Sequence, residues 1–540
     1  MTRTMYRVRR RAILGVAILV ALSIGTGALM LRPGSDRGPI IATIPIDRFP
    51  MLLAVDAQSE RALLGSANSA RLRLIDLKTG TIASSITLPQ PLPFIWSQGA
   101  GNIDERTGRV YIQGQTYNGP ASSSLSVLDM RSGRVVRTAP LPRSMSGLNV
   151  APAIDLRARR IFLWRNTVVF PPASALYPRS RAPGLRSRRW RGAVPFPSGT
   201  PTMRVEVSVL DAITLRLLTT VSVSARPNLN TGWGMSGSPI AVDTRTGRVF
   251  AGDIESNSLG MLDARTGRLL RTIALRPARS GSGGTPQVPT PIVDESLGRV
   301  YVVDSANGIV HILDAATGHV VRDVPTGPFA GMPLISHRAR RLYIFHNNGA
   351  VSVLDAVSGR LVRAAPPGSN PGASNYPYFG FGYSAASNER TGRVFIVNGQ
   401  AGTVNVLDGT SGQLLRAVGV CQHPTGAAID ARSGRVYVAC MGPFDPRRGP
   451  TGRGSVSVLD GRTGRVLRTI PVGVGPVVVS LDTRSQRALV VNTQGSGSPA
   501  PDAWGWLPVP LRRALPFLPR PASRPSPPSG SVTVIDTSRL

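Results

Sequence analysis

The sequence predicts an all-β fold, a single β-propeller of about nine four-stranded blades, with eight blades as the alternative. Two short hairpin patterns alternate along the chain, one typified by residues 456–470 and the other by residues 240–250. Internal repeats with a period of about 40 to 50 residues are typical of propellers, whose blades each have four antiparallel strands. Because two hairpins supply four strands, one pair of patterns predicts one blade.

Each pattern is a β-rich apolar run that ends at a polar residue and leads into a turn. Aspartate accepts hydrogen bonds from amides two or three residues further on, and glycine accepts the positive φ that hairpins need. The first pattern, whose strands we call c and d, turns at Asp76, Asp129, Asp211, Asp263, Asp314, Asp355, Asp408, Asp460 and Asp536. The second, whose strands we call a and b, turns at Asp56, Asp104, Asp155, Asp243, Asp294, Asp430 and Asp482, with Ser336 and Asn388 in two units.

The two ends of the chain are predicted to complete one another. The last unit stops after residues 532–536, so it has a strand c without its strand d. Near the start, residues 42–46 match a strand d and have no strand c before them. We therefore expect the N- and C-terminal strands to share one blade, which would close the ring and remove its open edges. The eight-bladed alternative has eight blades and one irregular unit, and the short stretch at residues 333–363 is the first candidate for that unit.

The N-terminus predicts a membrane anchor. Residues 1–11 are basic, and the uncharged run at residues 12–31 is long enough to cross about 30 Å of hydrocarbon as a helix. Basic residues before the run favour a cytoplasmic N-terminus and an external remainder. We expect a single-pass membrane protein with a linker at residues 32–38 and a propeller at residues 39–540. Cleavage of the segment as a signal peptide, giving a secreted protein, is the alternative.

Cys421 and Cys440 are the two cysteines of the chain, and both fall within one repeat. Antiparallel pairing across the turn at residues 431–434 brings their sulfurs to the same end of one hairpin. An exported protein can keep such a bridge oxidised. We therefore predict a disulfide, with two buried free thiols as the alternative.

Candidate ligand-binding residues lie in long insertions. Four antiparallel strands place the a–b and c–d turns on one face of the ring, and the longest insertions, near residues 166–204 and 493–530, fall on the other. Loops held by a rigid scaffold commonly carry function. Aromatic rings can stack on sugars, and arginines can contact anionic polymers; packing or solvation of the loops is the plainer interpretation. The candidates are Trp233, Tyr376, Tyr378 and Phe381, together with Arg188 and Trp190.

The repeat resembles the YVTN family of β-propeller repeats over roughly residues 39–540. Its strand b signature is matched at residues 111–114, 301–304, 395–398 and 437–440, and its strand c signature at the segments that end at Asp355 and Asp460. The resemblance implies a propeller and leaves the activity open. Residues 263–268 also look like the repeat of pyrroloquinoline-quinone dehydrogenases, although residues 269–271 replace the tryptophan that usually follows in that family.

These observations favour a binding or interaction scaffold at the cell envelope, with an envelope polysaccharide or a protein as partner. The alternative is a quinoprotein-like dehydrogenase, a lactonase-like enzyme, or a subunit of one. His311, His319, His337, His346 and His423 lack metal-binding spacing, so we predict no metal and no cofactor. The formal charge of +34 would suit nucleic acid, but export argues against a nucleic-acid partner.

Overall fold

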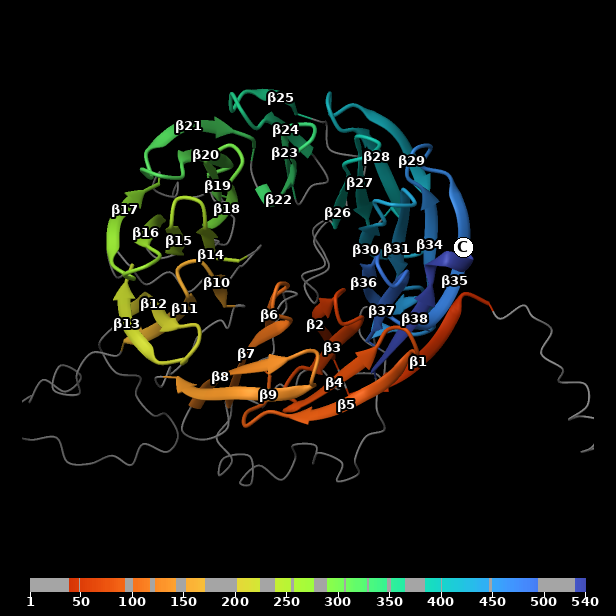
Figure 1. Ribbon diagram of the computed structural model, residues 1–540. Helices are drawn as coiled ribbons and strands as arrows, with labels where there is room; N and C mark the ends of the chain where they lie inside the picture. The colour runs from red at the N-terminus through yellow and green to blue at the C-terminus, as the bar shows by residue number, and fades with distance from the viewer. Residues whose placement is uncertain are drawn as a thin grey trace, which may run out of the picture.

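A computed structural model shows nine four-stranded antiparallel sheets arranged as the blades of a ring (Figure 1). It describes residues 38–47, 49–92, 101–116, 122–141, 152–169, 202–223, 238–253, 257–275, 289–304, 307–327, 330–346, 351–364, 384–399, 401–445, 449–493 and 530–540. The nine-bladed prediction is confirmed, and residues 333–363 belong to a full blade, blade 6, rather than to an irregular unit.

Each blade runs from an inner strand a to an outer strand d, and its strands follow chain order except at the closure. Blades 1 to 3 are β2 (Pro50–Asp56), β3 (Arg61–Ser66), β4 (Arg71–Asp76) and β5 (Thr81–Thr87); β6 (Gly101–Asp104), β7 (Arg109–Thr116), β8 (Ser122–Asp129) and β9 (Arg134–Leu141); and β10 (Ala153–Asp155), β11 (Arg160–Val169), β12 (Thr202–Asp211) and β13 (Leu217–Ser222).

Blades 4 to 6 are β14 (Ile240–Asp243), β15 (Arg248–Asp253), β16 (Ser258–Asp263) and β17 (Leu269–Ala274); β18 (Thr290–Asp294), β19 (Arg299–Asp304), β20 (Ile309–Asp314) and β21 (Val320–Pro325); and β22 (Ala330–Ser336), β23 (Arg341–His346), β24 (Val351–Asp355) and β25 (Leu361–Ala364).

Blades 7 to 9 are β26 (Ala385–Asn388), β27 (Arg393–Asn398), β28 (Thr403–Asp408) and β29 (Leu414–Gly419); β30 (Pro424–Ile429), β31 (Arg435–Cys440), β34 (Arg453–Asp460) and β35 (Val466–Val474); and β36 (Pro476–Asp482), β37 (Arg487–Asn492), β38 (Gly530–Asp536) and β1 (Ile40–Ile46). A small hairpin of β32 (Phe444–Asp445) and β33 (Gly449–Pro450) lies within blade 8, and a short 3-10 helix, η1 (Thr537–Arg539), follows β38.

The predicted closure is confirmed in blade 9. Strand β1 pairs antiparallel with β38, from Ile40 opposite Ile535 to Ile46 opposite Gly530. The first described strand of the chain is therefore the outer strand of the last blade. This pairing removes the open edge that an unclosed array of sheets would expose.

The core of the ring lies between blades rather than within them. Each of nine clusters of buried apolar side chains combines residues from two neighbouring blades. The cluster across the closure joins Ile44 and Val534 of blade 9 to Leu64 and Leu77 of blade 1. Because a blade buries its two faces only against two neighbours, closing the ring supplies the ninth interface.

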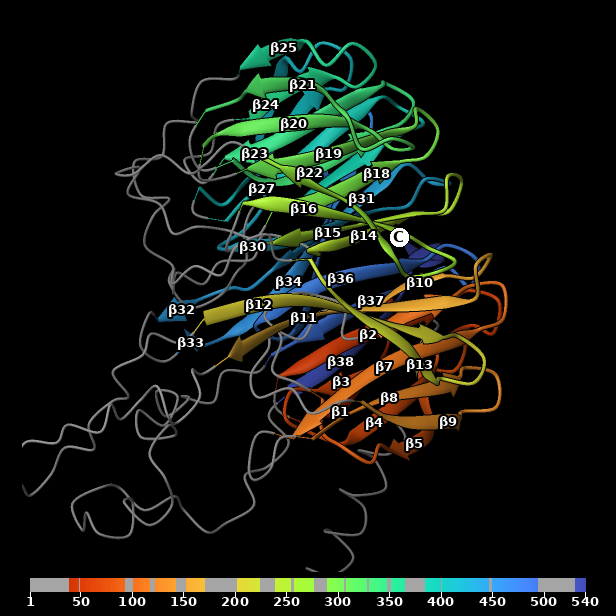
Figure 2. The same cartoon turned by 90° about the vertical axis from the view of Figure 1, so that its left-hand side faces the viewer.

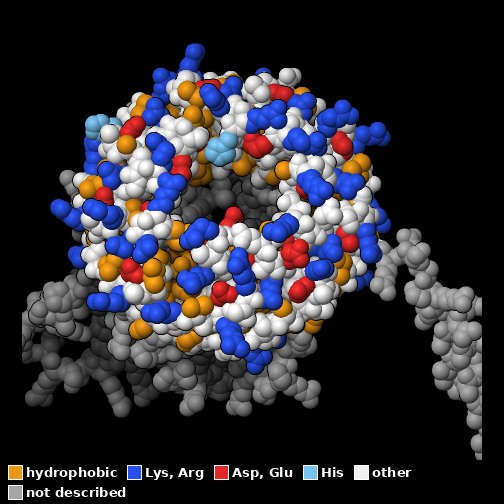
Figure 3. Space-filling model, viewed as in Figure 1, with side chains coloured by type: hydrophobic (Ala, Val, Ile, Leu, Met, Phe, Trp, Pro, Cys, Tyr) orange, Lys and Arg blue, Asp and Glu red, His pale blue; other side chains and the backbone are white. Residues whose placement is uncertain are grey.

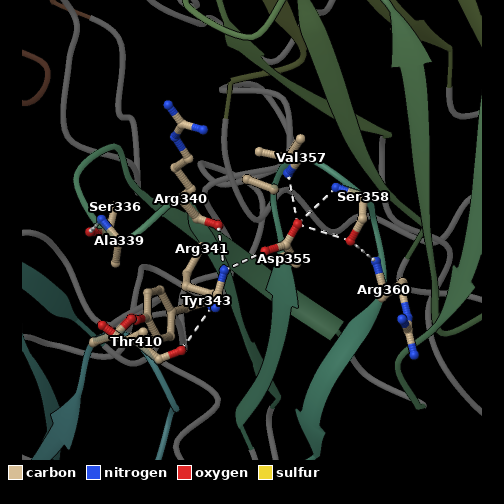
Figure 4. Close-up of polar contacts among 12 residues, drawn as sticks. Ser336, Ala339, Arg340, Arg341, Tyr343, Asp355, Val357, Ser358, Arg360 and Thr410 are labelled. Atoms are coloured by element: carbon tan, nitrogen blue, oxygen red, sulfur yellow. Dashed lines mark hydrogen bonds and ion pairs between the residues drawn. The ribbon is translucent and has the colours of Figure 1, made fainter.

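The turn aspartates act as the sequence predicts. In blade 6, Asp355 ends strand c, and its Oδ1 accepts hydrogen bonds from the amides of Val357 (3.2 Å) and Ser358 (2.8 Å) (Figure 4). Gly359 then adopts a φ of +67°. Burial alone would raise the pKa of Asp355, but hydrogen bonds from Ser358 and the charge of Arg341 outweigh burial and hold that pKa below its ordinary value.

Two faces result, a turn face with the a–b and c–d turns and a loop face with the b–c and d–a connections (Figure 2). At the loop face, strand pairing extends further than predicted, because Asn166–Val169 continue to pair with Thr202–Val205 inside the expected insertion. The predicted anchor at residues 12–31 lies outside the described residues. Among those that are described, no helix is long and apolar enough to cross a membrane.

Candidate functional site

An open pocket of about 670 Å³ lies on the loop face where blades 7 and 8 meet. Three connections build it: the β27–β28 turn, the β29–β30 connection, and the segment that leads from β31 into β32. Its lining comprises Ala401, Gly402, Gly419, Val420, Cys421, Gln422, His423, Pro443 and Phe444. Its volume falls within the range typical of ligand pockets, about 300 to 1,000 Å³.

A disulfide forms part of the pocket wall. Cys421, in the β29–β30 connection, is bonded to Cys440 at the end of β31. Gly402 of the preceding turn accepts hydrogen bonds on its carbonyl from the amides of Val420 (2.9 Å) and Cys421 (3.4 Å). A Cβ at Gly402 would lie 2.7 Å from the carbonyl oxygen of Cys421, so glycine is needed for this close approach. The wall is therefore held by a covalent bond and by tight backbone packing.

Two rings lie side by side in the pocket. His423 has a φ of +50°, and its Nδ1 donates a hydrogen bond to the carbonyl of Gly442 at 3.0 Å. The ring centroids of His423 and Phe444 lie 5.8 Å apart with a tilt of 55°. Together with the exposed amide of Gln422, these rings offer an aromatic surface with hydrogen-bonding groups at its edge.

A second polar cluster is buried near the loop face between blades 4 and 5. His311 lies between two carboxylates, with its Nδ1 at 2.7 Å from Asp323 and its Nε2 at 3.5 Å from Asp304. Asp304 also accepts hydrogen bonds from Asn257 of blade 4 (3.0 Å) and Asn307 (2.8 Å). The side chains of His311 and Asp304 are each 2% exposed, so this cluster is structural rather than open to a ligand.

The cluster perturbs the titration of its members. Burial alone would lower the pKa of His311, but the hydrogen bond with Asp323 and the nearby charge of Asp304 outweigh burial and raise that pKa. Burial alone would raise the pKa of Asp304, but hydrogen bonds from His311, Asn257 and Asn307 lower it. Within the described part of the chain, no group of histidine, cysteine and acidic side chains is arranged to hold a metal ion.

The turn face carries the repeated arginines, and these divide into two sets. The arginine that begins strand b joins blades: Arg341 forms an ion pair with Asp355 of its own blade, and its Nε donates to the carbonyl of Thr410 in blade 7 at 2.8 Å (Figure 4). Arg487 does the same across the closure, pairing with Asp536 and donating to the carbonyl of Leu77 in blade 1. These arginines are structural.

The second set lies at the tips of the turns and is exposed. Four of its members, Arg131, Arg157, Arg338 and Arg390, also donate hydrogen bonds to a neighbouring blade. Lys and Arg side chains are distributed around the whole ring on this face (Figure 3). The exposed acidic side chain of these turns is Glu105. The exposed basic side chains are Lys78, Arg106, Arg131, Arg157, Arg159, Arg216, Arg245, Arg265, Arg268, Arg338, Arg340, Arg360, Arg390, Arg432, Arg462, Arg465 and Arg484.

The ligand-binding residues predicted from the sequence, Trp233, Tyr376, Tyr378, Phe381, Arg188 and Trp190, lie outside the described residues. Cys421 and Cys440 are joined in the structure as the hairpin spacing suggests. The pocket itself was not predicted. Its signal in the sequence was the position of His423, two residues after a cysteine expected to be cross-linked, on the face expected to carry function.

Comparisons with known proteins give a family match and several similar solved structures. A family model described as the outer membrane protein assembly factor BamB matches residues 204–469. BamB from Moraxella catarrhalis is 15% identical, with 74% of this chain and 96% of that chain covered and a TM-score of 0.44. The computationally designed protein Ika8 is 12% identical, with coverages of 85% and 97% and a TM-score of 0.42.

The dihydro-heme d1 dehydrogenase NirN, in complex with DHE, is 15% identical, with coverages of 81% and 75% and a TM-score of 0.41. A search of curated protein sequences gives no match. The family match indicates similarity to a BamB-type repeat over residues 204–469, whereas the finer resemblance to the YVTN repeat stays a prediction.

Proposed function

We propose that this chain is a membrane-tethered interaction scaffold on the outer side of the membrane, and that the pocket between blades 7 and 8 receives an anchoring side chain of a partner protein. The observation that carries the proposal is the disulfide between Cys421 and Cys440 in the pocket wall. A disulfide persists in an oxidising compartment, and here it holds the connection that presents Gln422 and His423. A rigid pocket loses less entropy when it binds.

The chemistry of the pocket suits an aromatic or apolar anchor. Interfaces are organised around a few such side chains that fill pockets on the partner. Phe444 and His423 supply ring surfaces, while Gln422 and the glycine backbones at the rim supply hydrogen-bonding groups. An envelope polysaccharide could stack on the same rings. The experiment below distinguishes a polysaccharide ligand from a protein partner.

Two further observations support a scaffold at the envelope. The uncharged run at residues 12–31 supports a tether. The family model that matches residues 204–469 is described as an outer membrane protein assembly factor, which supports a role in contacts with other proteins. In the repeat that looks like that of quinoprotein dehydrogenases, Asp263 is engaged in its turn by Thr266 and in an ion pair with Arg248. Its carboxylate thus has a structural role.

Photo-cross-linking in the native membrane tests the proposal. A photoreactive amino acid at Gln422, in the pocket, should give one discrete protein adduct, and Phe444→Ala should reduce that adduct several-fold by removing the ring surface. Gln413 is a matched control, because it is an exposed glutamine of the same blade on the turn face. Equal protein adducts at Gln413 and Gln422, or no effect of Phe444→Ala, would contradict the proposal. A polysaccharide adduct at Gln422 would show that the ligand of the pocket is a polysaccharide and not a protein.

A further inference from the structure

The chain enters the ring on the turn face. Strand β1 begins at Ile40, which lies opposite Ile535 near the end of β38. The carbonyl of Pro39 accepts a hydrogen bond from the amide of Asp536 at 2.7 Å, and Asp536 leads directly into η1 at the turn face. Any segment that precedes residue 38 is therefore attached to the face that carries the arginine tips, opposite the pocket.

This attachment limits how far the turn face can lie from a membrane. The predicted linker, residues 32–38, spans at most about 25 Å when fully extended. Attraction between a basic protein surface and anionic headgroups acts over a screening length of about 8 to 10 Å at physiological salt. A tether of this length holds the ring near the bilayer and allows the turn face to come within the screening length of the lipid surface.

The composition of the turn face fits an anionic bilayer surface. Basic tips are distributed around the ring, as at Lys78, Arg265 and Arg462 in blades 1, 4 and 8. At the same position of the c–d turn, blades 3 and 6 instead expose Ile213 (54%) and Val357 (50%). Arginines mixed with exposed aliphatic side chains are typical of surfaces that lie at the headgroup boundary. A protein partner would be expected to occupy one patch rather than a whole face.

We propose that the turn face docks on anionic phospholipid, so that the disc lies against the membrane and the loop face with its pocket points outward. This inference rests on the tether in the proposed function and adds the orientation of the ring to it. It also gives the tip arginines a role that the blade-joining arginines do not have. The turn tips then contact the lipid surface, and the partner protein binds at the loop face on the opposite side of the ring.

The test uses the full chain reconstituted in phosphatidylcholine vesicles with and without about 30% phosphatidylglycerol. A lipid-reactive photo-cross-linker is placed at Ala316, an exposed alanine at the tip of the c–d turn of blade 5, or at Ala401, an exposed alanine at the rim of the pocket on the loop face. We expect lipid adducts at Ala316 and few at Ala401 when the vesicles are anionic. Mass spectrometry of the adducts is the readout.

A matched pair of charge variants makes the test specific. Arg265→Glu, Arg462→Glu and Arg484→Glu together should lower the adducts at position 316 by roughly tenfold or more, because each basic residue near the surface adds to the attraction. The control combines Arg71→Glu, Arg204→Glu and Arg453→Glu, which make the same change in net charge at exposed strand ends on the loop face. The control should leave the adducts unchanged.

The outcomes separate the docking from the proposed function. If the chain floats with the vesicles but gives equal or no lipid adducts at positions 316 and 401, the docking is wrong and the tether stands. If the chain does not float with either kind of vesicle, both tether and docking are wrong. A protein adduct at position 316 in native membranes would make the turn face a protein interface and overturn the lipid assignment. The pocket is judged separately, by the adduct at Gln422.

Discussion

At the scale of single residues, polar groups in this ring divide into those that hold the repeat together and those that remain available. The turn carboxylates accept bonds from their own hairpins, as Asp408 does from the amide and hydroxyl of Ser411. Tyr301 donates from its buried hydroxyl to the carbonyl of Ala356 in the next blade at 2.7 Å. Unpaired buried polar groups are costly, so these bonds make the repeated residues necessary to the fold. Exposed tip side chains such as Lys78 and Arg265 are not subject to that constraint.

His311 should make the stability of the ring depend on pH. Its pKa in the folded protein is raised, so its contribution is fully present below the ordinary pKa of 6.5 and is lost as the pH rises through the folded value. Asp304, whose pKa is lowered, contributes above its ordinary pKa of 3.8 and loses its contribution as the pH falls through its folded value. We therefore expect the melting temperature to fall as the pH rises above the ordinary histidine pKa of about 6.5.

Thermal unfolding of two variants checks this dependence. His311→Gln should flatten the fall in melting temperature above pH 6.5, because the buried cluster then has no imidazole that releases a proton. His319→Gln changes an exposed histidine at a turn of the same blade and should keep the slope of the unmodified protein. A slope that survives in His311→Gln would show that another group is responsible.

At the scale of elements, the sequence predicts the hairpins but not the conformation of the connections between them. Strand ends and turns follow from the aspartate and glycine spacing, since these residues decide the local backbone. The pocket was not predictable, because three connections from two blades meet there and their backbones depend on tertiary packing such as the approach of Gly402 to Cys421. The extension of β11 and β12 was missed because pairing partners decide where strands end.

The repeat pattern also does not reveal the polar contacts that join one blade to the next. The arginine that begins strand b is plain in the sequence, but its acceptor lies in the next blade, about 70 residues away for Arg341 and Thr410. Sequence spacing therefore predicts the arginine and not its partner. The disulfide was easier to predict, because both cysteines belong to one hairpin.

Removing one tie between blades should destabilise the ring measurably. Arg341→Gln loses the ion pair with Asp355 and the hydrogen bond to Thr410. We expect a loss of about 1 to 2 kcal/mol, because Arg341 and Asp355 are both charged and both partly buried. Urea unfolding is the measurement. Arg360→Gln, at an exposed turn position of the same blade, should change stability by less than about 0.5 kcal/mol; equal effects of the two variants would argue against the tie.

At the scale of the whole molecule, closure gives the ring two distinct faces. Nine interfaces between nine blades leave no open sheet face within the described ring, so the loop face and the turn face are fixed relative to one another. The N-terminal strand enters at one face and the pocket opens at the other. In the proposed account, this arrangement lets one face serve the membrane and the other serve a partner.

The central claim is that the first and last strands share blade 9, and an engineered cross-link tests it most directly. Pro45 and Ser531 face each other across β1 and β38, so Pro45→Cys with Ser531→Cys should form a second disulfide on oxidation by oxidised glutathione, which is reduced in the exchange, and raise the melting temperature. Pro45→Cys with Thr219→Cys, in the outer strand of blade 3, should leave both thiols free. Free thiols in the first pair, or a cross-link in the second, would contradict the closed ring.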